Sequence, residues 1–216
     1  MHNTVKNLIY IEELIKSKEN HDKLTRIIAV SKTFPIENVL PLIDYGHLHY
    51  GENKVQEALE KWTDVKNVNH NIQLHLIGRL QTNKVKFALK IFDYIHSLDS
   101  EKLATKISEE QVKQEKKPKI FIQVNIGNEE QKSGMNRDNL LNFYNYCKKL
   151  DLDIVGTMCI PPNDGNTKKY FSEMNNINQE LNFKELSMGM SEDYLEAIKN
   201  NATYVRVGSK IFGSRD

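Results

Sequence analysis

The sequence has few cysteines, almost no excess charge and no long apolar run, and each absence excludes a class of protein or partner. Its two cysteines, Cys147 and Cys159, form no CxxC pair and have no histidine cluster nearby. A disulfide scaffold and a structural metal site are therefore not expected. A formal net charge of +1 does not favour nucleic acid or an anionic membrane as the main partner. No stretch reaches transmembrane length or has the apolar core of a secretory signal. These absences predict a reduced, cytoplasmic protein.

The composition is that of an ordinary globular domain. Hydrophobic residues make up 39% and charged residues 27% of the 216 residues, which is enough to fill one large core. No linker rich in proline, glycine or serine divides the chain, so we predict a single domain over residues 1–216. An extra amphipathic helix is predicted at about residues 3–18, because Leu8, Ile11 and Ile15 share one helical face.

Beyond that helix, short apolar runs alternate with longer amphipathic segments. Strands are predicted at Ile27–Ser31, His47–Gly51, Gln73–Gly78, Tyr94–Leu98, Ile120–Ile126, Asp153–Cys159, Glu185–Met188 and Tyr204–Val207. Helices are predicted at Asn53–Trp62, Asn83–Ile91, Ser100–Val112, Asp138–Leu150, Asn166–Leu181 and Glu192–Lys199. This alternation is typical of parallel strands joined by helices. Eight such units in about 200–250 residues predict a (β/α)8 TIM barrel. An open doubly wound sheet is the alternative.

The predicted strands have one aliphatic face and one more polar face. Leu74 and Leu76 oppose His75, and the valines of the last strand oppose Arg206. If the aliphatic faces pack against outer helices, polar side chains from several strands converge inside the barrel. The alternative is that the polar faces are the exposed side of an open antiparallel sheet.

A lysine at the end of the first predicted strand is the strongest local signal. Lys32 shares a strand face with Ile28 and Val30, and a helix is expected directly after it. At the mouth of an apolar cavity a lysine amine loses hydration, its pKa falls, and it becomes nucleophilic. Such a lysine is the usual anchor for a carbonyl compound held as a Schiff base, above all pyridoxal phosphate. A solvated charge at a strand end is the alternative.

Two segments near the C-terminus are suited to bind an anion. Ser191 follows a strand end and a glycine turn, and it is the predicted N-cap of a helix whose free N–H groups suit a phosphate. Glu192 and Asp193 would oppose a dianion there, and capping alone also explains the pattern. In the second segment, Gly208 permits close backbone approach and Ser209 offers a hydroxyl. Loops after the last two strands of a barrel are the usual phosphate site.

Seven sequence blocks in a fixed order then point to a known family. They are AVSKT (29–33), YGENKVQE (50–57), HLIGRLQTNK (75–84), KSGM (132–135), GTM (156–158), LSMGMS (186–191) and VRVGSKIFG (205–213). From about Arg26 to its end, the chain closely resembles the pyridoxal-phosphate homeostasis proteins, the YggS/PROSC family. The resemblance implies the barrel of the alanine racemase N-terminal domain. It also implies binding of pyridoxal 5'-phosphate without an established catalytic activity.

The resemblance also assigns roles to individual residues. It implies that Lys32 forms the Schiff base and that Arg206 faces the pyridine nitrogen. The residues implied to line the ring pocket are Asn53, His75 and Met158, and those implied to hold the phosphate are Ser191, Gly208 and Ser209. Simpler interpretations stay open, in which His75 is a hydrogen-bonded core histidine, Met158 is ordinary packing and Asn53 is a helix cap.

Two residues bear on what a bound cofactor could do, one shared with the family and one that departs from it. An always-charged Arg206 beside the pyridine nitrogen would discourage protonation there, so carbanion chemistry would be weakly supported. Phe34 stands where some relatives carry a second lysine, so a role of that lysine in handing on the aldehyde is not expected here.

Two functions therefore compete. The favoured one is a non-catalytic carrier or regulator of intracellular pyridoxal phosphate, a monomer whose possible partners are enzymes that lack their cofactor. The alternative is a fold-type III enzyme such as an amino-acid racemase, which needs a second acid/base on the other face of the cofactor. In racemases that group is a tyrosine of a C-terminal β-domain, and this chain stops at Asp216. Racemases also have a phosphate-contacting tyrosine where Ile36 stands. Both differences favour the carrier.

Overall fold

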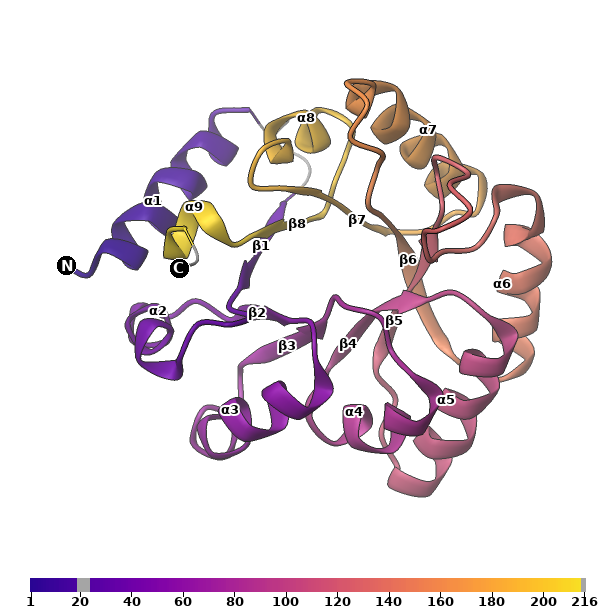
Figure 1. Ribbon diagram of the computed structural model, residues 1–216, viewed down its shortest axis with the longest axis horizontal. Helices are drawn as coiled ribbons and strands as arrows, with labels where there is room; N and C mark the ends of the chain where they lie inside the picture. Colours follow the sequence, from indigo (N-terminus) through magenta and orange to yellow (C-terminus); the bar gives the residue numbers. More distant parts are fainter. Residues whose placement is uncertain (19–23, 215–216) are drawn as a thin grey trace.

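Eight parallel strands form a closed barrel in the computed structural model, which describes residues 1–18 and 24–214. Each strand pairs with the next, and β8 pairs with β1 through Tyr204 opposite Arg26 (Figure 1). The predicted (β/α)8 barrel is confirmed, and the open-sheet and antiparallel alternatives are wrong. The strands are β1 Arg26–Val30, β2 His49–Glu52, β3 Gln73–Leu76, β4 Tyr94–Leu98, β5 Lys119–Val124, β6 Asp153–Cys159, β7 Glu185–Met190 and β8 Tyr204–Val207.

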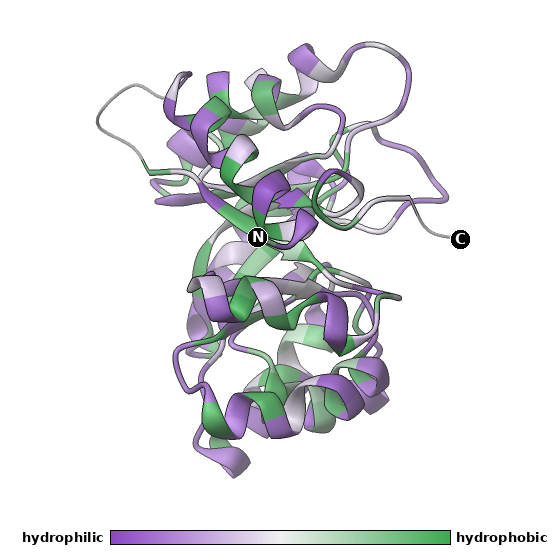
Figure 2. Cartoon of the chain, turned by 90° about the vertical axis from the view of Figure 1, so that its left-hand side faces the viewer, coloured by the Kyte–Doolittle hydropathy of each residue, from purple (hydrophilic) through white to green (hydrophobic). Residues whose placement is uncertain are grey.

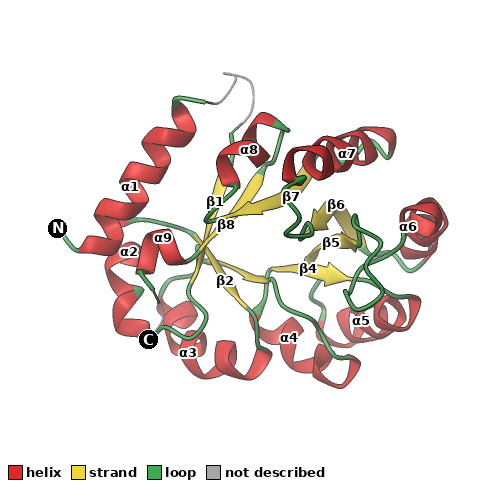
Figure 3. Cartoon of the chain, turned by 45° about the horizontal axis from the view of Figure 1, so that its top comes forward, coloured by secondary structure: helices red, strands yellow, loops and turns green. Residues whose placement is uncertain are grey.

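Helices surround the barrel, as Figures 1 and 3 show from two directions. They are α1 Asn3–Lys16, α2 Leu40–Tyr45, α3 Val55–Val68, α4 Val85–Ile91, α5 Glu101–Gln114, α6 Leu140–Lys149, α7 Thr167–Glu180, α8 Tyr194–Lys199 and α9 Ser209–Phe212. Short 3-10 turns occur at Ile36–Asn38, Thr82–Lys84 and Arg137–Asn139. None of the described helices combines the length and apolar character that are needed to cross a bilayer.

The segment after β1 departs from the sequence prediction. A helix is expected directly after Lys32, but α2 begins only at Leu40. The reason is Thr33, whose φ of 69° lies in the left-handed region and cannot continue a right-handed helix. Helix α2 is thus the expected helix, displaced toward the C-terminus. Helix α9 is absent from the predicted set because its four residues are too few to generate a periodic pattern. Conversely, α3 continues to Val68, beyond the predicted end.

The N-terminal helix is confirmed as an outer addition to the barrel. It ends at Lys16, slightly before the predicted boundary, and its buried face includes Leu8 and Ile11. Asn7 Nδ2 donates to the carbonyl of Ile211 at 3.0 Å, which joins α1 to α9. In Figures 1 and 3 these two helices lie side by side, next to α2.

The strand faces divide the apolar residues between two layers. Most aliphatic side chains pack between the strands and the helices, and the helices in Figure 2 accordingly carry both hydrophobic and hydrophilic bands. A smaller cluster fills the inside of the barrel, and it comprises Ile28, Val30, Tyr94, Phe121, Met158 and Tyr204. Polar side chains share this interior, because His75 stacks on Tyr94 with ring centroids 4.2 Å apart. The predicted convergence of polar groups inside the barrel is confirmed.

A buried ion pair ties the end of β1 to β2 and α3. The Glu52 side chain is fully buried, and its Oε1 accepts from Lys61 Nζ at 2.8 Å. The same oxygen accepts from Ser31 Oγ at 2.7 Å and from Trp62 Nε1 at 3.0 Å. Lys61 also donates to the Ser31 carbonyl at 2.8 Å. These bonds fix the backbone immediately before Lys32.

Glu52→Gln should destabilise the protein strongly, because it leaves the charge of Lys61 nearly buried without a counter-charge. We expect the free energy of unfolding to fall by about 3 kcal/mol, measured by chemical denaturation. Glu57→Gln is the matched control, because Glu57 faces the same lysine at 3.5 Å but is partly exposed. It should cost less than about 1 kcal/mol. Equal losses in the two variants would contradict the importance of the buried pair.

Candidate functional site

A cavity of about 500 Å³ opens at the carboxyl ends of the strands, which is where barrel proteins carry their active or binding sites. It contains six of the eight residues predicted for the site, namely Lys32, Asn53, Ser191, Arg206, Gly208 and Ser209. The other lining residues are Val30, Ile77, Ile160, Met190, Glu192 and Asp193. Residues predicted from four separate sequence blocks thus meet in one place.

Lys32 stands on a strained turn. Its neighbour Thr33 is β-branched and has a φ of 69°, a conformation that costs on the order of 1–3 kcal/mol and persists only where the surroundings hold it. Two hydrogen bonds do so: Thr33 N–H donates to Glu57 Oε1 at 2.7 Å, and Phe34 N–H donates to the Ser31 carbonyl at 3.1 Å. The turn gives Lys32 a partly buried position in the cavity wall.

Phe34 has a packing role in this turn. Its ring stacks on Phe212 of α9, with centroids 5.1 Å apart and ring planes inclined by 26°. The residue that replaces the second lysine of some relatives therefore joins the lysine turn to the last helix.

Asn53 reaches the cavity through a close contact between two loops. Helix α3 begins at Val55 with Lys54 as its N-cap and no side-chain capping bond, so the interpretation of Asn53 as a helix cap is wrong. Gly78, just beyond β3, packs against the Asn53 backbone, and a Cβ there would come within 2.3 Å of the Asn53 carbonyl oxygen. Only glycine permits this approach.

The two predicted anion segments adjoin one another. Ser191 Oγ accepts from the Gly208 N–H at 3.3 Å, which links the ends of β7 and β8. The prediction that Ser191 caps the next helix is wrong, because α8 begins at Tyr194 with Asp193 as its N-cap. Residues 191–193 form a turn before this helix, in which Asp193 Oδ1 accepts from the Met190 N–H at 2.6 Å. Ser191 is thereby left in the cavity wall.

Arg206 is a buried cation that has no carboxylate partner among the described residues. It points into the barrel from β8 and is only 4% exposed. Its Nη1 donates to Ser187 Oγ and its Nη2 donates to the Cys159 carbonyl, both at 2.8 Å. Burial lowers the pKa of the guanidinium, yet arginine remains charged at any physiological pH. Its hydrogen-bond partners are neutral, and Asp193 in the cavity wall acts on its charge without forming an ion pair with it. The cavity therefore favours an electron-rich ligand atom beside Arg206.

His75 and Met158 lie one side-chain layer below the cavity. Each lies two positions before a lining residue, Ile77 or Ile160, which directly follows the end of its strand. Both side chains are fully buried. His75 hydrogen-bonds on both sides, to His49 at 3.0 Å and to His96 at 2.9 Å. They support the cavity floor, and they do not belong to its lining.

Sequence reasoning missed two interior residues that contact this floor. Ser187 bonds both Arg206 and His96, and His96 lies on the inward face of β4 together with Tyr94. The alternation that identified His75 as inward-facing applies equally to Tyr94 and His96, so that signal was present in the sequence. Ser187 stood within the LSMGMS block without a role. Among the described residues, no group of three or more His, Cys, Asp or Glu side chains is arranged to hold a metal ion.

The buried histidines should make the protein sensitive to mild acid. Burial, followed by neighbouring positive charge, lowers the pKa of His75 and of His96 well below 6.5. Below pH 6.5 the unfolded chain therefore binds more protons than the folded one, and stability falls as the pH falls. Each imidazole contributes about 1.4 kcal/mol per pH unit.

This loss should be visible in denaturant titrations between pH 7 and pH 4. The window extends to about pH 4 because the pKa values of His47 and His49 are lowered to about 4 by burial. Replacing His96 by glutamine should make the dependence of the free energy of unfolding on pH shallower, by the equivalent of about one bound proton. A free energy of unfolding that is independent of pH across this window would contradict the buried neutral histidines.

Comparison with known proteins shows the family to which this chain belongs. The family model described as alanine racemase, N-terminal domain, matches residues 11–216. The pyridoxal phosphate homeostasis protein of Aquifex aeolicus is 37% identical over 204 residues, which covers 90% of this chain and 89% of that protein.

Solved structures agree with the sequence comparison. PipY of Synechococcus elongatus PCC7942, determined without pyridoxal phosphate, superimposes with a TM-score of 0.88 at 30% identity and covers 98% of this chain and 100% of that chain. Its form with pyridoxal phosphate bound gives a TM-score of 0.86 at 30% identity, with 97% and 100% covered. The resemblance that the sequence blocks indicated is confirmed.

Proposed function

The chain belongs to the alanine racemase N-terminal domain family and, within it, to the pyridoxal phosphate homeostasis proteins, and on that basis we propose that it binds pyridoxal 5'-phosphate and takes part in intracellular pyridoxal phosphate homeostasis. The observation that carries this proposal is that a lysine amine and a buried guanidinium with neutral hydrogen-bond partners line one cavity at the carboxyl ends of the strands. PipY, at 30% identity, has a structure with pyridoxal phosphate bound.

The cavity suits this cofactor in size and in chemistry. Its volume of about 500 Å³ lies within the range of small-molecule sites. A planar ring that carries an aldehyde, a pyridine nitrogen and a phosphate needs an amine, a polar contact for the nitrogen and an anion site. Lys32, Arg206 and the adjoining Ser191 and Gly208 segments offer these groups in one wall.

Each residue would then have a distinct task. Bound pyridoxal phosphate supplies an aldehyde that condenses with an amine and a ring that can accept electrons. The Lys32 amine would attach the aldehyde, with release of one water. Arg206 can only donate hydrogen bonds, so it would hold the pyridine nitrogen unprotonated. Residues proposed to bind the phosphate are Ser191, Gly208 and Ser209; those proposed to border the ring are Asn53, with His75 and Met158 beneath it.

The lining also favours a carrier over a racemase. A racemase needs a second proton donor opposite the lysine. The other titratable side chains in the described lining are Arg206, Glu192 and Asp193. The Asp193 carboxylate accepts a hydrogen bond from the Met190 N–H at 2.6 Å, and Glu192 is exposed to solvent. We therefore infer that the protein binds the cofactor without an efficient catalytic cycle.

Further properties belong to the same proposal. We propose a single cofactor-binding domain over residues 1–216 that acts as a monomer in the cytoplasm and passes pyridoxal phosphate to enzymes that lack it. Two buried free cysteines, Cys147 and Cys159, fit a reducing compartment.

The cofactor prediction can be tested with the purified protein. Incubation with pyridoxal phosphate should produce an absorption band in the violet, and borohydride should fix the cofactor on Lys32, as located by mass spectrometry of peptides. Lys32→Ala should lose the band and keep the fold. Lys54→Ala is the matched control, because Lys54 is exposed outside the cavity lining, and it should retain both. A label on another lysine would overturn the site.

The carrier prediction needs a separate experiment. The protein loaded with cofactor is incubated with D- and L-amino acids in heavy water, and exchange of the α-proton is followed by proton NMR. We expect little exchange, because the described lining offers no buried acid or base opposite Lys32. Exchange at about 1 per second or faster, within the range of ordinary enzymes, would show that the protein is a catalyst.

A further inference from the structure

A chain of hydrogen bonds runs through the barrel interior, starting from Arg206. Arg206 Nη1 donates to Ser187 Oγ at 2.8 Å, and the same oxygen lies 3.0 Å from His96 Nδ1. His96 Nε2 lies 2.9 Å from His75 Nδ1, and His75 Nε2 lies 3.0 Å from His49 Nδ1. Five side chains from five different strands thus form one continuous path.

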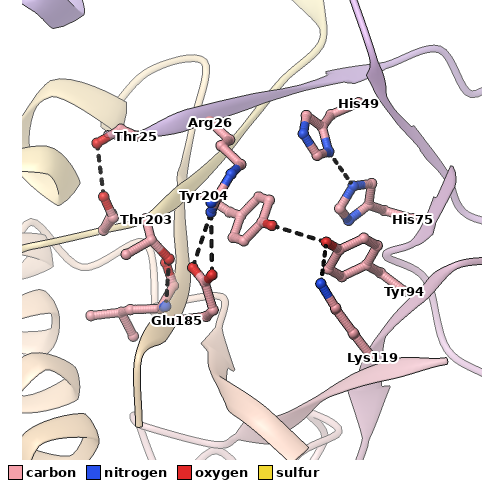
Figure 4. Close-up of polar contacts among 11 residues, drawn as sticks. Thr25, Arg26, His49, His75, Tyr94, Lys119, Glu185, Thr203 and Tyr204 are labelled. Atoms are coloured by element: carbon pink, nitrogen blue, oxygen red, sulfur yellow. Dashed lines mark hydrogen bonds and ion pairs between the residues drawn. The ribbon is translucent and has the colours of Figure 1, made fainter. Parts of the chain in front are cut away.

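The path connects opposite ends of the barrel. Arg206 lines the candidate cofactor cavity. His49 lines a second hollow of about 450 Å³, bordered also by Arg26 and His47, where the strands begin. Figure 4 shows this end, with His49 and His75 facing each other beside Tyr94 and Tyr204. Ser187, His75 and His96 between the two ends are at most 1% exposed.

Aromatic stacking holds the inner imidazoles in place. His75 stacks on Tyr94 with centroids 4.2 Å apart and an inclination of 17°. His96 stacks on Phe121, also at 4.2 Å, with an inclination of 20°. Because the ring planes are fixed, the chain can change only through the positions of its protons.

The guanidinium determines those positions. Arginine has no acceptor, so Ser187 Oγ must accept from Arg206. Within the described part of the chain, the acceptor for the Ser187 hydroxyl proton is His96 Nδ1. His96 in turn carries its proton on Nε2 and donates to His75, and His75 donates from Nε2 to His49. The opposite order would leave the buried Ser187 proton without an acceptor, which is strongly disfavoured. It would also point the His96 N–H dipole at a positive charge.

A doubly protonated imidazole does not fit in this chain either. With N–H groups on both nitrogens, it would face a neighbouring donor on one side. The directions of the pKa shifts of His75 and His96, both strongly downward, agree with neutral rings.

We infer that Ser187, His96, His75 and His49 are positioning residues for Arg206, locked by its charge into a single proton order with every imidazole protonated on Nε2. Polarised along one direction, the chain disperses a charge that forms no ion pair with a carboxylate of the described residues. The orientation of the guanidinium, and hence the contact that Arg206 is proposed to make with the cofactor ring, then depends on residues as far away as the opposite end of the barrel. This last consequence rests on the proposed function, whereas the proton order does not.

The proton order can be read directly from protein without added cofactor. Two-bond proton–nitrogen correlation spectra of ¹⁵N-histidine-labelled protein at pH 8 distinguish the two imidazole tautomers. His49, His75 and His96 should all appear as Nε2–H forms, with assignments from the single variants His49→Asn and His96→Gln. An Nδ1–H form, or a mixture, at any of the three would overturn the inference.

The dependence on Ser187 is tested with a pair of serine variants. Ser187→Ala removes the link to Arg206. His96, His75 and His49 should then each appear as a mixture of Nε2–H and Nδ1–H tautomers. Ser97→Ala is the matched control, because Ser97 is equally buried on the same strand as His96, and its hydroxyl has no hydrogen-bond partner among the described residues. It should keep all three Nε2–H signals. Unchanged tautomers at His75 and His49 in Ser187→Ala would contradict the coupling.

The effect on the cofactor is measured with the same pair after loading with pyridoxal phosphate. Ser187→Ala should shift the violet band and weaken binding by about tenfold, the size of one hydrogen bond to a charged group. Ser97→Ala should change neither. Equal binding by both variants would show that Arg206 needs no positioning from this chain.

A second pair tests the far end with little change in volume. His49→Asn retains an acceptor near the position of Nδ1, whereas His49→Leu removes it. The asparagine variant should keep the His75 and His96 tautomers and the wild-type band. The leucine variant should show mixed tautomers at His75 and His96 and a shifted band. If the two variants behave alike, whether both keep these signals or both lose them, transmission through the acceptor is contradicted. If no variant and no wild-type protein binds pyridoxal phosphate while the tautomers are as inferred, the proposed function fails and the proton order stands.

Discussion

A positive charge enclosed by the barrel, with no carboxylate at ion-pair distance among the described residues, constrains the rest of the interior. A carboxylate beside Arg206 would have satisfied the charge and closed the cavity to an electron-rich ligand atom. Two neutral acceptors, Ser187 Oγ and the Cys159 carbonyl, hold the guanidinium without neutralising it. The residues behind Ser187 are polar for the same reason, since a chain of polarisable imidazoles stabilises a buried charge better than aliphatic packing would.

The two faces of the sheet consequently have different roles: the outer face attaches the helices, and the inner face supports the cavity. Outside, aliphatic side chains and the Glu52–Lys61 pair attach the helices and fix the backbone before Lys32. Inside, stacked aromatic rings and hydrogen-bonded imidazoles support the cavity from below. The strained turn at Thr33 lies where these two systems meet. Its conformation is held from outside by Glu57, and it presents the lysine to the inside.

Individual residues show how far prediction from the sequence could go. The inward direction of His75 and Arg206 followed from strand alternation, and the same rule would have found His96. Helix α9 was missed because four residues leave no periodic signal. The N-cap Asp193 was missed because the hydrogen bond that the Met190 N–H donates to its side chain forms only in the folded turn. The interpretation of Asn53 as a cap failed because its position depends on a contact with Gly78, which is distant in sequence.

By itself, the sequence determined the barrel and the family, since strand periodicity, helix amphipathicity and the order of the motif blocks are properties of neighbouring residues. It also determined which residue types were available for the site. Only the tertiary structure decided which of them share the cavity wall and which lie beneath it. It alone revealed that Ser187 joins Arg206 to three histidines, because hydrogen bonds between side chains of different strands depend on how the closed sheet brings those strands together, and no local pattern records that arrangement.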